Sequence, residues 1–228
     1  MKPRIIYALV AIIIIIISIF GVRQYLENER YENFLSRQVA NDIGRLTGAV
    51  RVNETIYDEI SSSRSLSLEQ VETLFHNNHS IVNIAQEHKN LVLQFKRSGQ
   101  ELDNIPANKA SDIAYYFKRL IWDIAERQGI DVSNKTTQFP IHLSKSKPYP
   151  IKDKELKKIR IIKGLNNTWS QVISNNVKCV SDEGIMNSDI FFDEYVDKGI
   201  TSDYWVNVAV EMEKRTDKYL DKNYLLLN

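Results

Sequence analysis

The strongest feature of the hydropathy pattern is an uninterrupted apolar segment near the N-terminus. Residues 5–22 include no charged side chain, and six consecutive isoleucines lie at positions 12–17. As a helix rising about 1.5 Å per residue, this segment would extend roughly 27 Å, close to the thickness of about 30 Å of a bilayer's hydrocarbon core. A lone segment in lipid must be helical, because its backbone polar groups have no other partners. The pattern therefore predicts a transmembrane helix over residues 5–22.

A cleaved signal peptide is the alternative interpretation of this segment. Lys2 and Arg4 would suit one, but the apolar stretch is longer than the usual length of about 7–15 residues, and no A-x-A pattern follows it. Lipoprotein processing would need a cysteine directly after the stretch, and the single cysteine is Cys179. We therefore expect an uncleaved signal-anchor.

The orientation of the span follows from the basic residues beside it, because Lys and Arg close to a span favour the cytoplasmic side. Residues 1–4 form a short tail that carries Lys2 and Arg4, whereas the arginines after the span are spread over residues 23–37. The denser positive charge predicts a cytoplasmic N-terminus. The remaining chain would then be an extracytoplasmic domain on a single-pass protein of the cell membrane.

Beyond the span, apolar residues recur at the spacing of a helix. The first such stripe predicts a helix that continues out of the membrane as a stalk and ends at the serines 61–63. Its members are Leu35, Val39, Ile43, Leu46, Val50, Tyr57 and Ile60. Gly44 and Gly48 fall on the opposite face, where we expect a local weak point or bend rather than a close helix contact.

A capping-box pattern begins the next predicted helix, since Ser67 is followed three residues later by Gln70. A seam with alternating spacings of four and three residues then continues for about three heptads, as in a helix bundle or a short coiled coil. Its members are Leu74, Asn78, Ile81, Ala85, His88, Val92 and Phe95. We interpret Asn78 and His88 as hydrogen-bonded core residues that set the register; a pH switch at His88 is the functional alternative.

A third helix is predicted from Pro106, which suits a first turn, to a left-handed cap at Gly129. Residues 131–150 have no helical period and are rich in Asn, Ser, Thr and Pro, which predicts a long loop that allows a short strand over residues 139–143. Such loops are often functional or mobile.

The remaining pattern predicts three more helices. Asp153 would cap the fourth, a short helix would run from Ser188 to Gly199, and the last would start near Ser202. The whole chain is then all-α: a basic tail (1–4), a transmembrane anchor (5–22) and an antiparallel bundle of four to five helices (23–228).

Composition narrows the class of protein. The chain has 228 residues, 30 Lys and Arg against 29 Asp and Glu, eight Gly, five Pro and one Cys. The low Gly and Pro content argues against a turn-rich β-sandwich. One cysteine excludes an intramolecular disulfide, and a net charge of +1 gives no reason to expect nucleic acid as a partner.

The sequence contains no motif that specifies an enzyme. Phosphate-binding glycine loops, H-E-x-x-H and G-x-S-x-G are absent. The best metal candidates are His76 and His79, with Glu72 one turn earlier, because two imidazoles at i and i+3 can share one ion. No third protein ligand stands out, so we expect a solvated polar face, no metal and no cofactor. We interpret Cys179 as a buried structural thiol.

The near-neutral total charge conceals two oppositely charged segments. Residues 145–163 carry a net charge of +6 and residues 182–222 carry −6. One interpretation is that they complement each other across a helix pair. The other is that the basic segment faces phospholipid headgroups or an anionic envelope polymer. The anion-facing candidates are Lys152, Lys154, Lys157, Lys158, Arg160 and Lys163.

An anchor followed by a helical bundle resembles, in architecture only, the extracytoplasmic part of bacterial sensor proteins, which also have a second span and a cytoplasmic output domain. We expect a non-enzymatic interaction or sensing module of the cell envelope, not an enzyme. Its partners would be the bilayer, through residues 5–22, and an unknown protein or anionic envelope component; self-association stays open. The alternatives are a metal-dependent hydrolase using His76 and His79, and a membrane-tethered adaptor that faces the cytoplasm.

Overall fold

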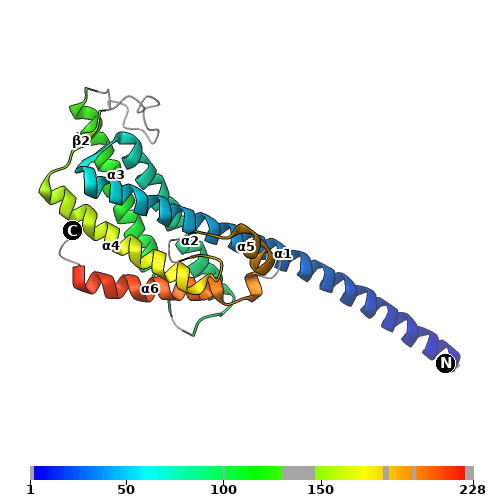
Figure 1. Ribbon diagram of the computed structural model, residues 1–228. Helices are drawn as coiled ribbons and strands as arrows, with labels where there is room; N and C mark the ends of the chain where they lie inside the picture. Colours follow the sequence, from blue (N-terminus) through cyan, green and yellow to red (C-terminus); the bar gives the residue numbers. More distant parts are fainter. Residues whose placement is uncertain (1–2, 100, 130–146, 182–184, 197–198, 224–228) are drawn as a thin grey trace.

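The computed structural model of the protein describes residues 3–99, 101–129, 147–181, 185–196 and 199–223 (Figure 1). Over these residues the fold is all-α, as predicted, and strands are limited to two residues each. The elements are α1 (Pro3–Ser63), β1 (Ser65–Leu66), α2 (Leu68–Gln94), α3 (Ile105–Arg127), β2 (Tyr149–Pro150), α4 (Asp153–Asn176), α5 (Ser188–Tyr195), the 3₁₀ turn η2 (Gly199–Thr201) and α6 (Tyr204–Asn223).

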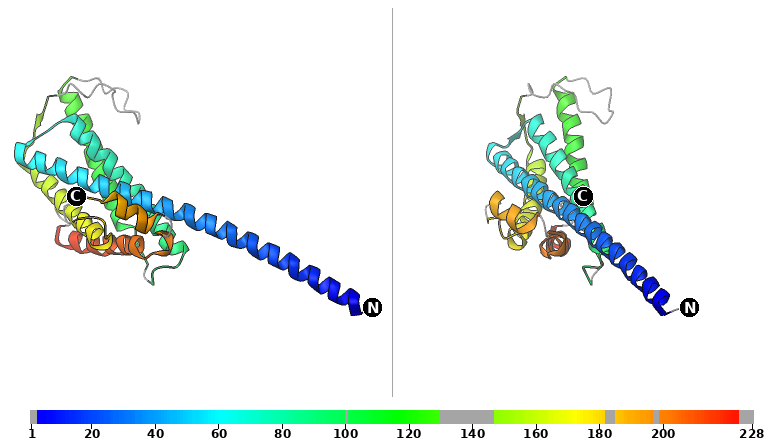
Figure 2. Two further views of the ribbon diagram at one scale, coloured as in Figure 1. Left: turned by 45° about the vertical axis from the view of Figure 1, so that its right-hand side comes forward. Right: turned by 90° about the vertical axis from the view of Figure 1, so that its right-hand side faces the viewer.

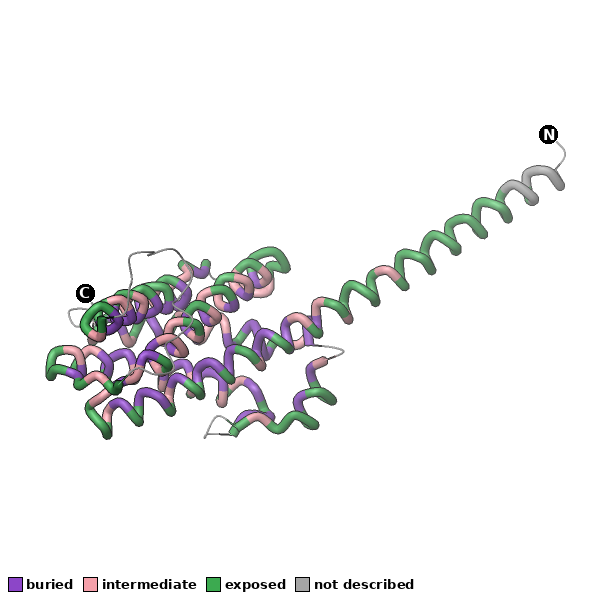
Figure 3. Tube along the Cα trace, turned by 90° about the horizontal axis from the view of Figure 1, so that it is seen from above, coloured by how far each residue is buried: buried purple, intermediate pink, exposed green. Residues whose placement is uncertain are grey.

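Helix α1 has two parts that differ in burial. The apolar side chains from Ile12 to Phe20 are 53–65% exposed, and exposure continues through Phe34 (Figure 3). From Leu35 onward the helix packs into the bundle, and it ends at Ser63 as predicted. Within the described part of the chain, α1 is the one helix apolar and long enough to cross a membrane, and its apolar window is not buried at all. We call residues 23–34 the stalk.

The packed half of α1 lies between α2 and α4 in an antiparallel bundle and keeps one face exposed to solvent. Helices α2 and α4 pack against it, α3 pairs with α2, and α6 lies along α4 and also contacts α2 and α3 (Figures 1 and 2). The direction of α2 is clear from its contacts with α1: Gln70 lies against Glu59, and Glu87 against Gln38. The largest fully buried side chains are Trp169, Trp205, Tyr57 and Phe117. The predicted bundle is therefore confirmed, with five long helices and the short α5.

The helix ends agree with the sequence pattern in some places. The capping box of α2 is present: Gln70 N donates to Ser67 Oγ at 3.1 Å, and Ser67 N donates to Gln70 Oε1 at 2.9 Å. Gly129 has a φ of +73°, the left-handed geometry expected after α3. At Gly44 and Gly48 an added Cβ would meet no atom within 4 Å, so neither mediates a close helix contact.

Other helix ends differ from the prediction. The cap of α4 is Lys152 rather than Asp153, because Lys152 keeps an extended backbone and its N–H donates to Glu155 Oε2 at 3.1 Å. The short α5 stops at Tyr195, and Gly199 belongs to the turn η2. A Cβ on Gly199 would lie 3.3 Å from the carbonyl oxygen of Ser36, so this close approach favours glycine.

The predicted loop contains one strand that the pattern missed. Tyr149 and Pro150 pair antiparallel with β1, which ties the chain before α4 to the end of α1. The strand considered at residues 139–143 lies outside the described residues.

The two polar residues in the α2 seam are both buried. Asn78 Nδ2 donates to the carbonyl oxygen of Leu74 at 2.7 Å, as expected for a core amide. His88 packs edge-on against Trp205, with ring centroids 6.0 Å apart, and its Nε2 has no hydrogen-bond partner among the described atoms. The expected hydrogen bonding is therefore found for Asn78 and not for Nε2 of His88. Burial lowers the pKa of His88 to about 4, so the ring is neutral at pH 7.

Candidate functional site

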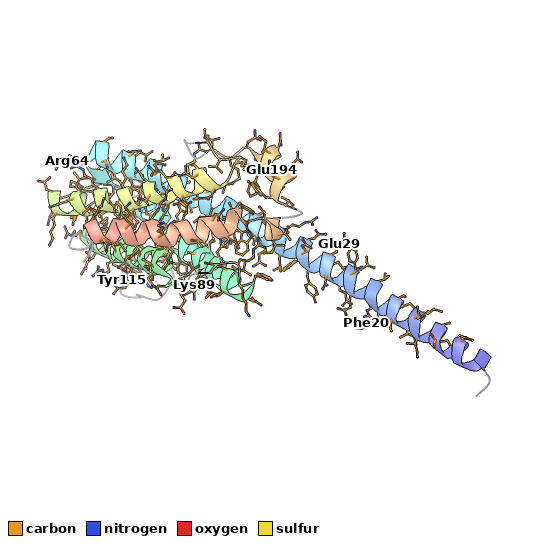
Figure 4. The ribbon with its side chains drawn as sticks, turned by 90° about the horizontal axis from the view of Figure 1, so that it is seen from below. Phe20, Glu29, Arg64, Lys89, Tyr115 and Glu194 are labelled. Atoms are coloured by element: carbon orange, nitrogen blue, oxygen red, sulfur yellow. The ribbon has the colours of Figure 1, made fainter. Side chains whose placement is uncertain are left out.

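The basic segment lies at the end of the bundle farthest from the apolar part of α1. Ile151 N donates to the carbonyl oxygen of Arg64 at 2.9 Å, and Arg64 forms an ion pair with Asp153. Helix α4 therefore begins where α1 ends. Figure 4 shows Arg64 at one end of the molecule and Phe20 toward the other.

The six predicted anion-facing residues do not share one environment. Four are exposed to solvent: Lys152, Lys154, Lys157 and Arg160. We call these four residues the distal patch. Lys163 is half-buried and forms an ion pair with Asp58 of α1, and half-buried Lys158 faces α3.

The two oppositely charged segments do not neutralise each other through ion pairs in the part of the chain that the structure describes. Helices α4 and α6 meet through neutral groups: Trp169 Nε1 donates to Thr216 Oγ1 at 2.8 Å, and the Tyr219 hydroxyl donates to the carbonyl oxygen of Ile161 at 2.8 Å. Acidic side chains of residues 182–222 instead contact other parts of the protein. Glu213 accepts hydrogen bonds from the backbone N–H groups of Asp103 and Ile105 at the start of α3. Asp203 forms an ion pair with Arg97.

The length of α1 sets the distance between the distal patch and the apolar segment. From Val22 to Ser63 a straight helix advances roughly 60 Å at 1.5 Å per residue. If residues 5–22 span a bilayer, a tilt of about 40°, the upper end of the usual range, still leaves roughly 45 Å. Surface charge is screened over about 8 Å in physiological salt. Headgroups of a bilayer spanned by residues 5–22 would therefore be too far away to attract the distal patch.

Beside the distal patch, α3 and α4 enclose a cavity of about 220 Å³. It is lined by Lys109, Asp112, Ile113, Tyr115, Tyr116, Arg119, Lys158 and Ile162. We call it the α3–α4 cavity. Of this set, the charge pattern of the sequence indicated only Lys158. The available signal was the i, i+4 spacing of Tyr115 and Arg119 on a helix, which is common and not specific.

Tyrosine rings hold two of the cations in this cavity. The Arg119 guanidinium lies 4.9 Å from the centre of the Tyr115 ring, and Lys158 Nζ lies 5.0 Å from that of Tyr116. Neither cation forms an ion pair with a carboxylate among the described residues. Lys109 does pair with Asp112, at 2.7 Å. The lining therefore carries three positive charges and one negative charge.

The electrostatics of Lys158 reflect this crowding. Burial lowers its pKa, and the neighbouring cations Arg119 and Lys154 lower it further, while Asp112 acts in the opposite direction. A nearby anion would stabilise the charged form of such an ammonium group. The residues that line the α3–α4 cavity thus carry more positive than negative charge.

The metal candidates do not converge on a third ligand within the described residues. His76 Nε2 lies 3.8 Å from Glu72 Oε1, and both histidine rings contact Phe75, with centroids 5.0 Å away for His76 and 6.1 Å for His79. No group of three or more His, Cys, Asp or Glu side chains able to hold a metal occurs over the same residues. Cys179 is buried, and burial raises the pKa of its thiol.

Comparisons with protein-family models, with curated proteins and with solved structures find no match to this chain.

Proposed function

We propose that the protein is a single-pass, membrane-anchored interaction module that holds the distal patch away from the bilayer to bind an anionic component of the cell envelope. The observation that carries this proposal is one continuous helix that joins the apolar segment to the bundle. From Val10 to Phe34 this helix is largely exposed and has no buried residue. The anchor confines the bundle to one membrane surface. The stalk and the packed half of α1 then present the cations to a partner located farther out.

The orientation of the domain is tested with a membrane-impermeant maleimide on intact cells. Cys179 is replaced by serine, and Lys218, exposed on α6, is replaced by cysteine (K218C). We expect labelling without permeabilisation, because the domain is extracytoplasmic. Labelling only after permeabilisation would instead support the cytoplasmic-facing adaptor.

The distal patch is tested with the full chain in lipid nanodiscs and isolated cell walls that carry anionic polymer. The triple variant Lys152→Gln, Lys154→Gln, Lys157→Gln should co-sediment with the walls several-fold less than the unmodified chain. The matched control is Lys214→Gln, Lys218→Gln, Lys222→Gln on exposed positions of α6, which changes the net charge equally. Equal binding by both triples would contradict the proposal, because general charge attraction would then explain the association.

A further inference from the structure

We propose that the α3–α4 cavity is a binding site for a phosphoryl group carried on an organic molecule or polymer. This inference rests on the proposed function and gives the anionic partner a chemical class and a place. The site combines Lys158 of the basic segment with residues of α3 that lie outside it.

The charge of the lining suits a doubly charged anion. Lys109, Arg119 and Lys158 contribute three positive charges, and Asp112 contributes one negative charge. A phosphate monoester carries about −1.5 to −2 at pH 7, which matches the remaining charge better than a single carboxylate does. A phosphodiester polymer carries one negative charge per phosphate and would supply this charge from two adjacent phosphates. The site draws its cations from two helices, which makes it more specific than a row of lysines on one helix.

The cations are also held in place before a ligand arrives. Arg119 rests against Tyr115, and Lys158 against Tyr116. Such contacts stabilise the cation against the face of the ring and leave N–H groups available as donors. A guanidinium presents a fork of donors that fits phosphate oxygens, and an ammonium adds a second point of charge.

The shape of the cavity indicates what the phosphoryl group is attached to. A volume of about 220 Å³ exceeds the space that a bare anion needs. The rings of Tyr115 and Tyr116 provide aromatic surface beside the cations, and the buried Ile113 and Ile162 lie beneath them. An aromatic or other flat apolar group next to the phosphate would therefore cover surface of the tyrosine rings that inorganic phosphate leaves exposed to water.

A neighbouring cavity does not extend this site. It shares Tyr116 and Arg119 but is also lined by the carboxylates of Asp123 and Glu155. Those carboxylates would repel an anion. The phosphoryl group is thus confined to the side where Lys109 and Lys158 lie.

The probes are phenyl phosphate, inorganic phosphate and poly(glycerol phosphate), titrated calorimetrically into the full chain in nanodiscs. We expect saturable binding of phenyl phosphate with a Kd below about 1 mM, and weaker binding of inorganic phosphate. Arg119→Gln and Lys158→Gln should each weaken binding by about tenfold or more, as expected when a charge-assisted hydrogen bond is lost. The matched controls Arg51→Gln on α1 and Lys218→Gln on α6 remove the same charges from exposed positions outside both the cavity and the distal patch, and they should change Kd less than about twofold.

The comparison of the probes shows which kind of molecule carries the phosphoryl group, and the variants show which results overturn the inference. Poly(glycerol phosphate) binding that depends on Arg119 assigns the site to an envelope polymer, whereas binding of phenyl phosphate alone assigns it to a monoester. If Arg119→Gln lowers the Tm, Lys109→Gln replaces it as the test variant. Absence of saturable phenyl phosphate binding, or equal loss in variants and controls, overturns the inference. The proposed function still stands in that case if the cell-wall experiment gives its expected result.

Discussion

Gly164 of α4 and Tyr219 of α6 fit together so closely that a Cβ on Gly164 would overlap the Tyr219 hydroxyl. That hydroxyl donates to the carbonyl oxygen of Ile161 at 2.8 Å. The contact lies between the two helices whose opposite charges, in one interpretation of the sequence, complement each other. The helices are instead joined by close packing and neutral hydrogen bonds.

The first prediction follows from this contact. Gly164→Ala should lower the free energy of unfolding by about 1–2 kcal/mol, because Tyr219 must move and lose its hydrogen bond. Urea unfolding of the full chain in nanodiscs measures the change. In a Tyr219→Phe background the cost of Gly164→Ala should be smaller, since the overlapping atom is gone. An equal cost in both backgrounds would show that the two residues are not coupled.

Gly44 is the control position for Gly164, because an alanine side chain there would not contact any other residue. It lies inside α1, and an added Cβ meets no atom within 4 Å. Gly44→Ala should therefore raise the free energy of unfolding by about 0.5–1 kcal/mol, the usual gain of alanine over glycine in a helix. A loss of stability in the same urea experiment would mean that α1 needs a bend at this position.

The second prediction concerns His88 and acid. Its pKa is about 4 in the folded protein and about 6.5 when unfolded, so the unfolded state takes up the proton first as the pH falls. Stability attributable to neutral His88 is complete above pH 6.5 and decreases toward pH 4. The difference corresponds to about 3 kcal/mol at most. Asp42 acts in the opposite direction, because burial raises the pKa of its carboxyl.

Unfolding at several pH values between 7 and 4 measures this effect. The variant His88→Leu keeps an apolar side chain in the seam and removes the titrating group. We expect the slope of stability against pH between 6.5 and 4 to become markedly flatter in the variant. The same slope in both proteins would show that other groups control the acid sensitivity.

The third prediction concerns the start of α3. Asn104 has a φ of +67° and makes no side-chain cap, while Glu213 Oε1 accepts hydrogen bonds from Asp103 N at 2.8 Å and Ile105 N at 3.2 Å. A carboxylate at a helix N-terminus is stabilising. Glu213→Ala should therefore lower the free energy of unfolding by about 1 kcal/mol. Asp217→Ala, one turn later and exposed, is the control and should change stability by less than about 0.5 kcal/mol.

The sequence predicted those features of the fold that depend only on residues within one helix. The apolar segment, the seam through Leu74 and Ile81 and the capping box at Ser67 each need only neighbouring residues to be recognised. The cap of α4 was misplaced by one residue because Lys152 does not resemble a capping residue; Glu155 supplies the hydrogen bond instead.

The candidate site depended on information that a single helix does not contain. Lys158 was recognised as part of a basic run, but Lys109 and Arg119 lie near it only because the tertiary structure brings residues of α3 and α4 to one cavity. The pairing of Lys163 with Asp58, more than a hundred residues earlier, likewise removed one cation from the predicted surface. Such partners are fixed by tertiary structure, which the charge pattern of one segment cannot specify.

The central claim is that α1 holds the distal patch far from the membrane in which it is anchored. Energy transfer from a dye at position 154 (K154C in a Cys179→Ser background) to acceptor lipids in a nanodisc measures that height. We predict roughly 60 Å for a helix along the bilayer normal and not less than roughly 45 Å when it is tilted. A dye on the stalk, at Tyr31→Cys, should report roughly 14 Å from the end of the apolar segment. A height below about 20 Å at position 154 would place the patch at the bilayer surface and contradict the account.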